Sequence, residues 1–317
     1  MVVACLGAQA SADPVVVAVV EKPVTEKPVK KVKLAAIKPE PTEFTNDPVL
    51  GLASRVNGEE AKGVVAFTFD DGPNPETTPA VIDALDKYDI PATFFIVTQR
   101  ISGKHGDKAR EVLAHELERG YLVGSHSVTH RWLGKADAKI LDREMDPSLK
   151  RLSEEAKRPI GLFRAPYGAM NGTGRVRLRK LGVTEVFWSI DTLDWKAKHA
   201  DVLRKKVLKM ILAQDGGVVL MHDIRPITAK IIADVFDDLE AENCKRLADK
   251  REPIYPVSIH YFLRDGKTAR AIPDDVTKRT DAYKKALPER CMKRPPPTPP
   301  VGDFPCATNP LAKGCTK

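Results

Sequence analysis

The sequence Thr68-Phe69-Asp70-Asp71-Gly72-Pro73 ends an apolar run, residues 63–69, with two adjacent carboxylates and a turn. An apolar run of this length before Gly and Pro predicts a buried strand with carboxylates at its carboxyl end. Two histidines follow in His126-Ser127-Val128-Thr129-His130, and His222 comes after the apolar run 218–221. One carboxylate with two histidines, and a second carboxylate to spare, suits a catalytic metal.

Apolar runs of strand length alternate with amphipathic stretches of helix length after residue 46. The expected strands are 63–69, 92–97, 121–125, 161–163, 184–188, 217–221 and 255–259, and the expected helices are 77–88, 107–119, 137–157, 171–181, 201–214 and 228–248. Pro147 should kink or split the third helix. This alternation predicts an α/β fold with a parallel sheet, either open or closed into a barrel.

The chemically suggestive side chains all fall just after expected strands. They are Asp70, Asp71, His126, His130, Arg164, Asp191, Asp194 and His222. In parallel α/β folds the functional groups gather at the carboxyl ends of the strands, so these residues should meet at one edge. The other histidines, His105, His115, His199 and His260, lack such a context, and we expect them to be surface or packing residues.

The composition allows a globular enzyme, because 317 residues with 42% hydrophobic content can form one large α/β domain or two smaller ones. The net charge is +8, but Lys and Arg are spread along the chain and much of the excess lies in the tails. We therefore expect no nucleic-acid partner and favour an anionic cell wall or membrane surface. No segment after the first residues has the apolar length of a transmembrane helix.

Residues 1–12 resemble the remnant of a secretory signal, with an apolar core followed by small residues. We therefore expect an exported protein, periplasmic or secreted. The sequence before Cys5 also resembles a lipoprotein processing box, but simple cleavage is favoured because four residues cannot make a full signal. Residues 13–45 repeat Glu-Lys-Pro-Val and predict an extended, semi-rigid linker.

Four cysteines lie in the last third of the chain: Cys244, Cys291, Cys306 and Cys315. In an exported protein an even number predicts two disulfides, with three connectivities open. We expect Cys306 to pair with Cys315 and Cys244 to pair with Cys291, which would pin the tail to the domain. Four free thiols are the alternative.

Hydrolysis of an amide needs an activated water, stabilisation of the oxyanion, a base and an acid. A divalent metal can supply the first two, and catalytic zinc typically has three protein ligands and an open position. Asp71, His126 and His130 offer such a ligand set, and Asp70 remains as the base. Zinc is the default metal, although cobalt, nickel or manganese would suit the same ligands.

Arg164 could hold Asp70 ionised and oriented through a charge-assisted hydrogen bond. His222 is then the acid, and a nearby carboxylate would raise its pKa and keep it protonated at neutral pH. Each of these patterns has a structural interpretation when it stands alone; Asp-Asp-Gly-Pro, for example, is most often a turn. Their combination in this order favours a functional site.

The patterns resemble the motifs of the polysaccharide deacetylases, the family-4 carbohydrate esterases that share the NodB homology domain, over residues 63–262. The stretch 68–73 is similar to the first motif and 126–130 to the second. The resemblance implies that Asp70 is the base and that Asp71 is a metal ligand. It also implies that the two histidines of the second motif complete the metal site.

Arg164-Ala165-Pro166-Tyr167-Gly168 resembles the third motif. This similarity implies that Arg164 buttresses the base and that the backbone N–H of Tyr167 helps to bind the oxyanion, with Pro166 beside it in the substrate site. Asp191-Thr192-Leu193-Asp194-Trp195 resembles the fourth motif, which implies that Trp195 forms a wall of the acetyl pocket. Asp194 is preferred to Asp191 as the residue that tunes the catalytic histidine.

Val219-Leu220-Met221-His222-Asp223 resembles the fifth motif, which implies that Leu220 lines the acetyl pocket and that His222 is the acid. Asp223 would orient the loop. The fold implied by the family is a distorted (β/α) barrel of about seven strands. The expected organisation is a signal remnant (1–12), a linker (13–45), the catalytic domain (46–262) and a C-terminal extension (263–317).

These expectations describe an exported, metal-dependent hydrolase that removes acetyl groups from N-acetylated sugars of a polymer, with peptidoglycan N-acetylglucosamine as the expected substrate. Chitin oligomers, an exopolysaccharide and O-acetyl groups are the alternative substrates. A non-enzymatic alternative is a wall-binding structural protein, which the intact set of ligands, base and acid argues against. The sequence leaves the oligomeric state open.

Overall fold

A computed structural model describes residues 49–51 and 55–294. The predicted signal remnant and linker, Cys5, and the Cys306–Cys315 pair therefore lie outside the described residues.

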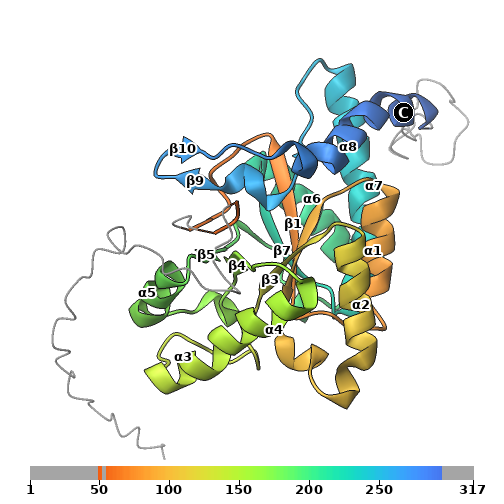
Figure 1. Cartoon of the computed structure of the whole chain (residues 1–317). Coiled ribbons are helices and arrows are strands. Elements are labelled where there is room, and N and C mark those ends of the chain that lie inside the picture. Colours follow the sequence, from red (N-terminus) through yellow and green to blue (C-terminus); the bar gives the residue numbers. More distant parts are fainter. Residues whose placement is uncertain (1–48, 52–54, 295–317) are drawn as a thin grey trace, which may run out of the picture. The chain divides into compact units, whose positions relative to one another are not determined.

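The domain is built on a parallel sheet that curls into a half-barrel, in the order β5-β4-β3-β2-β1-β7-β6 (Figure 1). The strands are β1 Val64–Asp70, β2 Ala92–Ile96, β3 Leu122–Ser125, β4 Leu162–Phe163, β5 Thr184–Glu185, β6 Ile190–Asp191 and β7 Gly216–His222. An eighth strand, β8 Tyr255–Pro256, pairs with the first two residues of β1. The predicted distorted barrel of about seven parallel strands is thereby confirmed.

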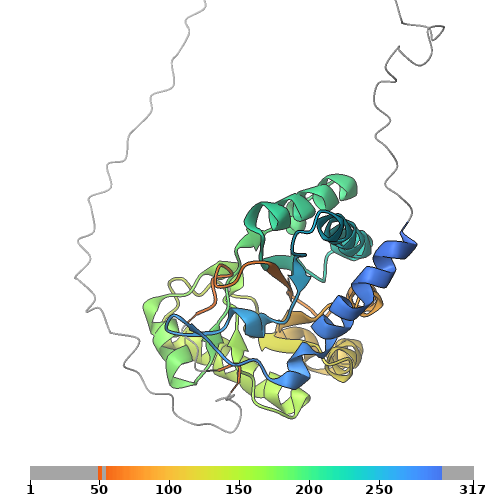
Figure 2. The ribbon, with the colours of Figure 1, turned by 90° about the horizontal axis from the view of Figure 1, so that it is seen from above.

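Helices surround the sheet (Figures 1 and 2). They are α1 Thr78–Lys87, α2 Asp107–Glu118, α3 Ala138–Glu144, α4 Asp146–Ala156, α5 Gly172–Lys180, α6 Ala200–Gln214, α7 Pro226–Ala248 and α8 Asp274–Lys293, with short 3-10 turns at η2 Thr98–Ile101, η3 Lys104–Gly106, η4 Pro166–Gly168, η5 Asp194–Lys196 and η6 Ile259–Phe262. The central strand β1 is rich in β-branched and aromatic residues, and six of its seven residues are buried.

Strand register brings the predicted site residues to one edge. Asp70, the last residue of β1, lies opposite His222 on β7 and Phe95 on β2. Ser125, which precedes the histidine loop, lies opposite Ile96 on β2. Because all these strands are parallel, their carboxyl ends and the loops that follow them meet at the same end of the sheet.

Two differences from the sequence prediction have local causes. The predicted helix 137–157 is split at Met145, because Pro147 lies in the first turn of α4 and cannot donate to a preceding turn. The predicted strand 184–188 ends at Glu185, and two-residue β6 was not predicted. A strand of two residues is too short to produce a periodic pattern.

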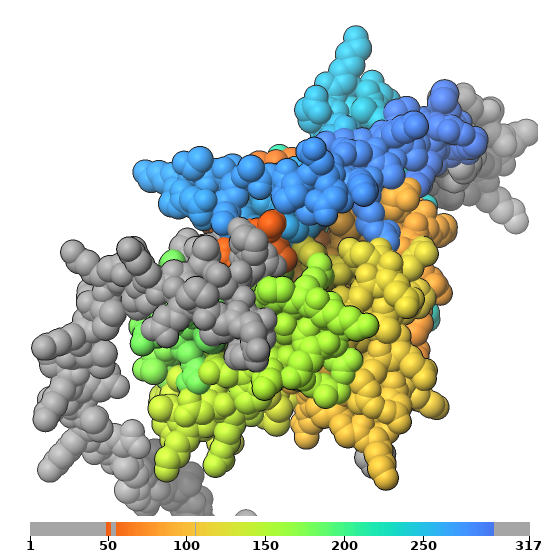
Figure 3. Space-filling model, in the orientation of Figure 1, coloured from red at the N-terminus to blue at the C-terminus, as the bar shows by residue number. Residues whose placement is uncertain are grey.

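The sequence patterns also did not predict α8 or the hairpin of β9 Arg264–Asp265 and β10 Thr268–Ala269. Figure 3 shows this part of the chain as a continuous blue band. Tyr283 and Leu287 of α8 are buried in the main hydrophobic core. Cys244 of α7 and Cys291 of α8 form a disulfide with a Cα–Cα distance of 5.3 Å, which confirms the predicted pair.

No helix in the described part of the chain has both the length and the apolar character of a membrane span.

We expect the disulfide to stabilise the domain, because it closes a long loop and holds α8 on the core. Replacing both Cys244 and Cys291 by Ser should lower the free energy of unfolding by about 2–4 kcal/mol. Urea unfolding of the double variant and the parent protein under non-reducing conditions measures this difference. Met292→Ala, at an exposed neighbouring position, is the control. Equal stability of the double variant and the parent would contradict the expectation.

Candidate active site

The two carboxylates at the end of β1 face different surroundings. Asp70 is the last strand residue and is buried, whereas Asp71 has a positive φ of 76° and starts the turn. The Gly72 carbonyl in this turn accepts a hydrogen bond from Val97 at 3.2 Å. The change in backbone direction lets neighbouring residues serve different functions.

The histidine loop, residues 126–130, follows β3 and is fixed at several points. His126 N–H donates to the Ile96 carbonyl at 2.8 Å, and the Ser127 hydroxyl accepts from His130 N–H at 3.1 Å. The Thr129 backbone N–H donates to the Glu144 carboxylate at 2.8 Å. These bonds hold a loop in which Ser127 and His130 both have positive φ.

Positive φ is concentrated at this end of the sheet. Of the nine non-glycine residues with positive φ in the described chain, five lie in loops after strands of the site: Asp71, Ser127, His130, Tyr167 and Leu193. Such backbone is uncommon and is retained where the surrounding structure enforces it, often at functional sites.

Asp71, His126 and His130 could hold a metal ion, since one ligand atom from each lies within 4.8 Å of the others. Asp71 Oδ1 is 3.1 Å from His130 Nε2 and 3.6 Å from His126 Nε2. The same oxygen is buried and has no hydrogen-bond partner, a costly arrangement that a cation would relieve. The residues therefore fit a divalent metal with mixed nitrogen and oxygen ligands.

His126 has the protonation state that a ligand needs. Burial lowers its pKa to about 3, against the opposing charge of Asp71, so the ring is neutral at neutral pH. Its Nδ1 lies 2.7 Å from the Arg164 carbonyl and donates to it as the N–H tautomer, which leaves Nε2 as the ligand atom.

Asp70 is paired with Arg164, whose side chain is fully buried. The guanidinium donates to Asp70 Oδ1 at 2.7 Å and to the Thr68 hydroxyl at 2.8 Å. It also donates to the carbonyls of Val186 and Phe187, at 3.2 and 3.1 Å. Burial raises the pKa of Asp70, although the charge of Arg164 opposes the rise. The result is an oriented carboxylate with increased basicity.

His222 and Asp194 form a second pair. Asp194 Oδ1 accepts from His222 Nδ1 at 2.7 Å, and Oδ2 accepts from the His222 backbone N–H at 2.8 Å. Burial would lower the pKa of His222, but the hydrogen bond and charge of Asp194 raise it to about 9. Asp191 instead accepts from Leu193 N–H at 3.0 Å. The carboxylate that touches the histidine is therefore Asp194.

The remaining predicted residues lie around these groups. The Tyr167 ring is exposed and packs edge-on against His130, with centroids 4.6 Å apart, while Pro166 is buried. Trp195 is exposed on η5, directly after Asp194, and Leu220 is buried in β7. Each predicted member of the site thus comes from one of the loops or strand ends at this edge.

Two contributors were not predicted from the sequence. The Thr228 hydroxyl of α7 donates to Asp194 Oδ2 at 2.5 Å, and Arg100 of η2 lines a cavity with Asp71 and His130. Neither residue belongs to a recognisable motif, and both contacts depend on tertiary packing. Asp223 is buried, accepts from the Thr78 hydroxyl and lies so close to Gly72 that any side chain there would collide with it.

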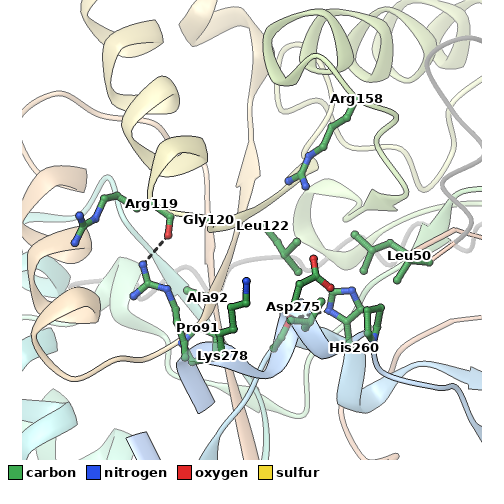
Figure 4. A pocket seen from close by; sticks show the side chains of 15 residues that line it. Leu50, Pro91, Ala92, Arg119, Gly120, Leu122, Arg158, His260, Asp275 and Lys278 are labelled. Atoms are coloured by element: carbon green, nitrogen blue, oxygen red, sulfur yellow. Dashed lines mark hydrogen bonds between the residues drawn. The ribbon is translucent and has the colours of Figure 1, made fainter. Parts of the chain in front are cut away.

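The cavity beside the metal-ligand candidates measures about 380 Å³. Another cavity, of about 620 Å³, lies at the opposite end of the sheet beside the first residues of β2 and β3, Ala92 and Leu122 (Figure 4). Its lining includes His260, whose Nδ1 is 2.8 Å from the Ser258 hydroxyl. None of the predicted ligand, base or acid residues line the larger cavity, whereas Asp71 and His130 line the smaller one.

Comparison with known proteins places these residues in context. A family model described as polysaccharide deacetylase matches residues 57–186. The chain is 34% identical over 178 residues to the peptidoglycan-N-acetylglucosamine deacetylase PgdA of Listeria monocytogenes, covering 56% of this chain and 36% of that protein. The chain thus spans about a third of the length of this relative.

A chitooligosaccharide deacetylase of Rhizobium leguminosarum bv. trifolii is 33% identical over 159 residues, covering 50% of this chain and 71% of the relative. A solved peptidoglycan N-acetylglucosamine deacetylase matches with a TM-score of 0.55 and 24% identity, over 68% of this chain and 94% of that one, which supports the fold. The fold, the order of the site residues and the coverage of the Rhizobium protein agree, and this chain belongs to the polysaccharide deacetylase family.

Proposed function

We propose that this protein is a metal-dependent deacetylase that removes acetyl groups from N-acetylated sugars of a polymer, with peptidoglycan N-acetylglucosamine as its substrate. The observation that carries the proposal is the meeting of three groups at one sheet edge. These are the Asp71–His126–His130 ligand set, the buried Asp70–Arg164 pair and the Asp194–His222 pair. Together they supply a metal site, a base and an acid.

A divalent metal held by Asp71, His126 and His130, with zinc as the default, would polarise the acetyl carbonyl and increase the acidity of water. Asp70 accepts the proton of the attacking water, because its pKa is raised by burial and Arg164 fixes its position. His222 donates a proton to the leaving amine nitrogen, since Asp194 keeps it protonated. The backbone N–H of Tyr167 is the proposed second donor to the oxyanion.

Two side chains would shape the acetyl pocket. Leu220 is buried at the end of β7, two residues before His222, and offers an apolar surface to a methyl group. Trp195 would provide a wall next to Asp194. Pro166 would support the turn that carries Tyr167.

The preference for peptidoglycan rests on the net charge of +8, which suits an anionic wall, and on the name of the Listeria relative. Chitooligosaccharide is a second candidate substrate because the Rhizobium relative is named for it and is covered over 71% of its length. We also propose export to the periplasm or beyond. The Cys244–Cys291 disulfide supports this location, because disulfides persist mainly in oxidising compartments.

Acetate release tests the proposed function. The metal-loaded protein should release acetate from purified peptidoglycan, and a chelator should abolish the release. Chitooligosaccharides are measured in parallel, and release from them alone would move the substrate to chitin-like sugars. If neither substrate yields acetate above the chelated control, the proposed activity is wrong.

Ligand and base variants separate metal binding from turnover. The double variant His126→Ala, His130→Ala should lose both the metal and acetate release. Asp70→Asn should keep the metal, because Asp70 is reserved for the base, and should lower turnover at least ~100-fold. Elemental analysis and an acetate assay measure the two properties. His115→Ala, at an exposed position on α2, is the control, and stoichiometric metal in the double variant would refute the ligand assignment.

The pH dependence of kcat/KM tests the acid. His222 must be protonated to donate, and its pKa of about 9 predicts that activity falls as the pH rises through about 9. Asp194→Asn removes the charge that raises this pKa, so the alkaline limb should move down by at least about one pH unit. Asp191→Asn, at a carboxylate that does not contact His222, should leave the limb in place. If the alkaline limb of the pH profile stays in place in Asp194→Asn, Asp194 does not raise the pKa of His222 as proposed.

A further inference from the structure

The cavity lined by two of the three metal-ligand candidates is also lined by an arginine that takes no part in the proposed mechanism. Arg100 lines this cavity of about 380 Å³ together with Asp71 and His130, and its neighbours there are Val97, Gln99 and Thr129. Its side chain is exposed. A guanidinium in the same cavity as the proposed metal site can reach a substrate bound there.

The backbone of Arg100 is fixed relative to the histidine loop. Thr98 and Gln99 of η2 donate their N–H groups to the carbonyls of Ser127 and Val128, at 3.1 and 2.9 Å. Thr98 and Ile101, which flank the exposed pair Gln99 and Arg100, are buried. These hydrogen bonds tie η2 to the histidine loop, so the backbone of Arg100 is held in a fixed position relative to the loop that carries His126 and His130.

Two arginines that contact η2 have structural partners, whereas the Arg100 guanidinium has none among the described residues. Arg110 and Arg151 both donate to the Ile101 carbonyl, at 2.7 and 3.3 Å, and so brace η2. The Arg100 guanidinium forms no hydrogen bond or ion pair with any residue in the described ranges. This cation is therefore available to a ligand.

The nearby acids are already engaged. Glu144 accepts hydrogen bonds from the backbone and hydroxyl of Thr129, and Asp107 pairs with Arg110. Asp71 faces the two histidines. The charge of Arg100 also acts on the buried Asp223, which accepts a hydrogen bond from the Thr78 hydroxyl. None of these four carboxylates forms an ion pair with the Arg100 guanidinium in the described residues, so a carboxylate from outside the chain can bind it.

Guanidinium groups bind carboxylates through two parallel hydrogen bonds. A neutral polymer of N-acetylated sugars offers no anion, whereas peptidoglycan alternates N-acetylglucosamine with a sugar whose lactyl ether carries a carboxylate or a peptide. We propose that Arg100 binds a carboxylate of the substrate next to the acetylated sugar, and so selects carboxylate-bearing polymers over neutral ones. This inference rests on the proposed function and defines its substrate class.

The test compares two soluble substrates of equal length. One is a peptidoglycan oligosaccharide with free lactyl carboxylates, and the other is a neutral chitooligosaccharide. The ratio of their kcat/KM values should fall about 3- to 10-fold in Arg100→Gln, as expected for the loss of one solvent-accessible guanidinium–carboxylate ion pair. Arg100→Lys should retain most of the preference at low salt, because it keeps the charge.

Arg158→Gln is the matched control. Arg158 is also exposed, and its guanidinium has no partner among the described residues, but it lines the cavity at the other end of the sheet (Figure 4). This variant removes the same charge and should leave the ratio unchanged. An equal fall in both arginine variants would indicate a general effect of net charge and overturn the proposal, as would an unchanged ratio in Arg100→Gln.

Two further arms identify the carboxylate. If the lactyl carboxylate is the partner, the parent protein should act on the oligosaccharide with amidated lactyl carboxylates with a kcat/KM as low as that of Arg100→Gln on the unmodified oligosaccharide. If an oligosaccharide that carries stem peptides is discriminated instead, the partner is a peptide carboxylate. In both cases the discrimination should weaken with rising salt, because the contact is solvent-accessible.

Binding measurements separate the failure of this inference from the failure of the proposed function. Dissociation constants of both oligosaccharides are measured for two proteins, the Asp70→Asn variant and the double variant Asp70→Asn, Arg100→Gln. This binding measurement does not require turnover. If the double variant binds the carboxylate-bearing oligosaccharide more weakly than Asp70→Asn does, and binds the neutral one equally well, the inference is supported even if no acetate is released. Equal binding by the two proteins overturns it even if the enzyme is active.

Discussion

The ion pair between Arg164 and Asp70 is the interaction on which the rest of the site depends. Both side chains are removed from water, and the guanidinium also donates to the Thr68 hydroxyl and to the carbonyls of Val186 and Phe187. The arginine thereby joins the ends of β1, β4 and β5. An unpaired charge in this position would be strongly destabilising, so the two residues can be kept only as a pair. The carboxylate of the proposed base is consequently held in one orientation.

The two histidines on either side of Asp70 show how the same side chain acquires opposite properties. His126 is buried and donates to a backbone carbonyl, and desolvation keeps it neutral. His222 is also largely buried, but two contacts with Asp194 make its charged form the stable one. Burial alone therefore does not decide the protonation state. The nature of the partner at Nδ1, a neutral carbonyl or a carboxylate, decides it.

Much of the fold could be predicted because long elements repeat their pattern, as in β1 and β7, or contain a clear break, as at Pro147 in α4. The site could be predicted because its residues directly follow strands, and parallel strands bring their ends together. The two-residue strand β6 carries no periodic signal. Thr228 is distant in sequence from Asp194, so only the packed structure shows that the two side chains are in contact. Helix α8 has a low hydrophobic content and few buried residues, so its position on the core also could not be predicted from its sequence pattern. The free guanidinium of Arg100 likewise becomes visible only when its neighbours are seen to be paired.

The contact between Gly72 and Asp223 limits how this sequence can change. Gly72 does not need glycine for its backbone angles, since its φ is not in the left-handed region. It needs glycine because the buried Asp223 carboxyl occupies the space of a Cβ atom. A larger residue at position 72 therefore requires the Asp223 carboxyl to move or to be replaced by a smaller side chain. The turn that carries Asp71 and the loop that carries His222 are thus sterically coupled, although they are far apart in the chain.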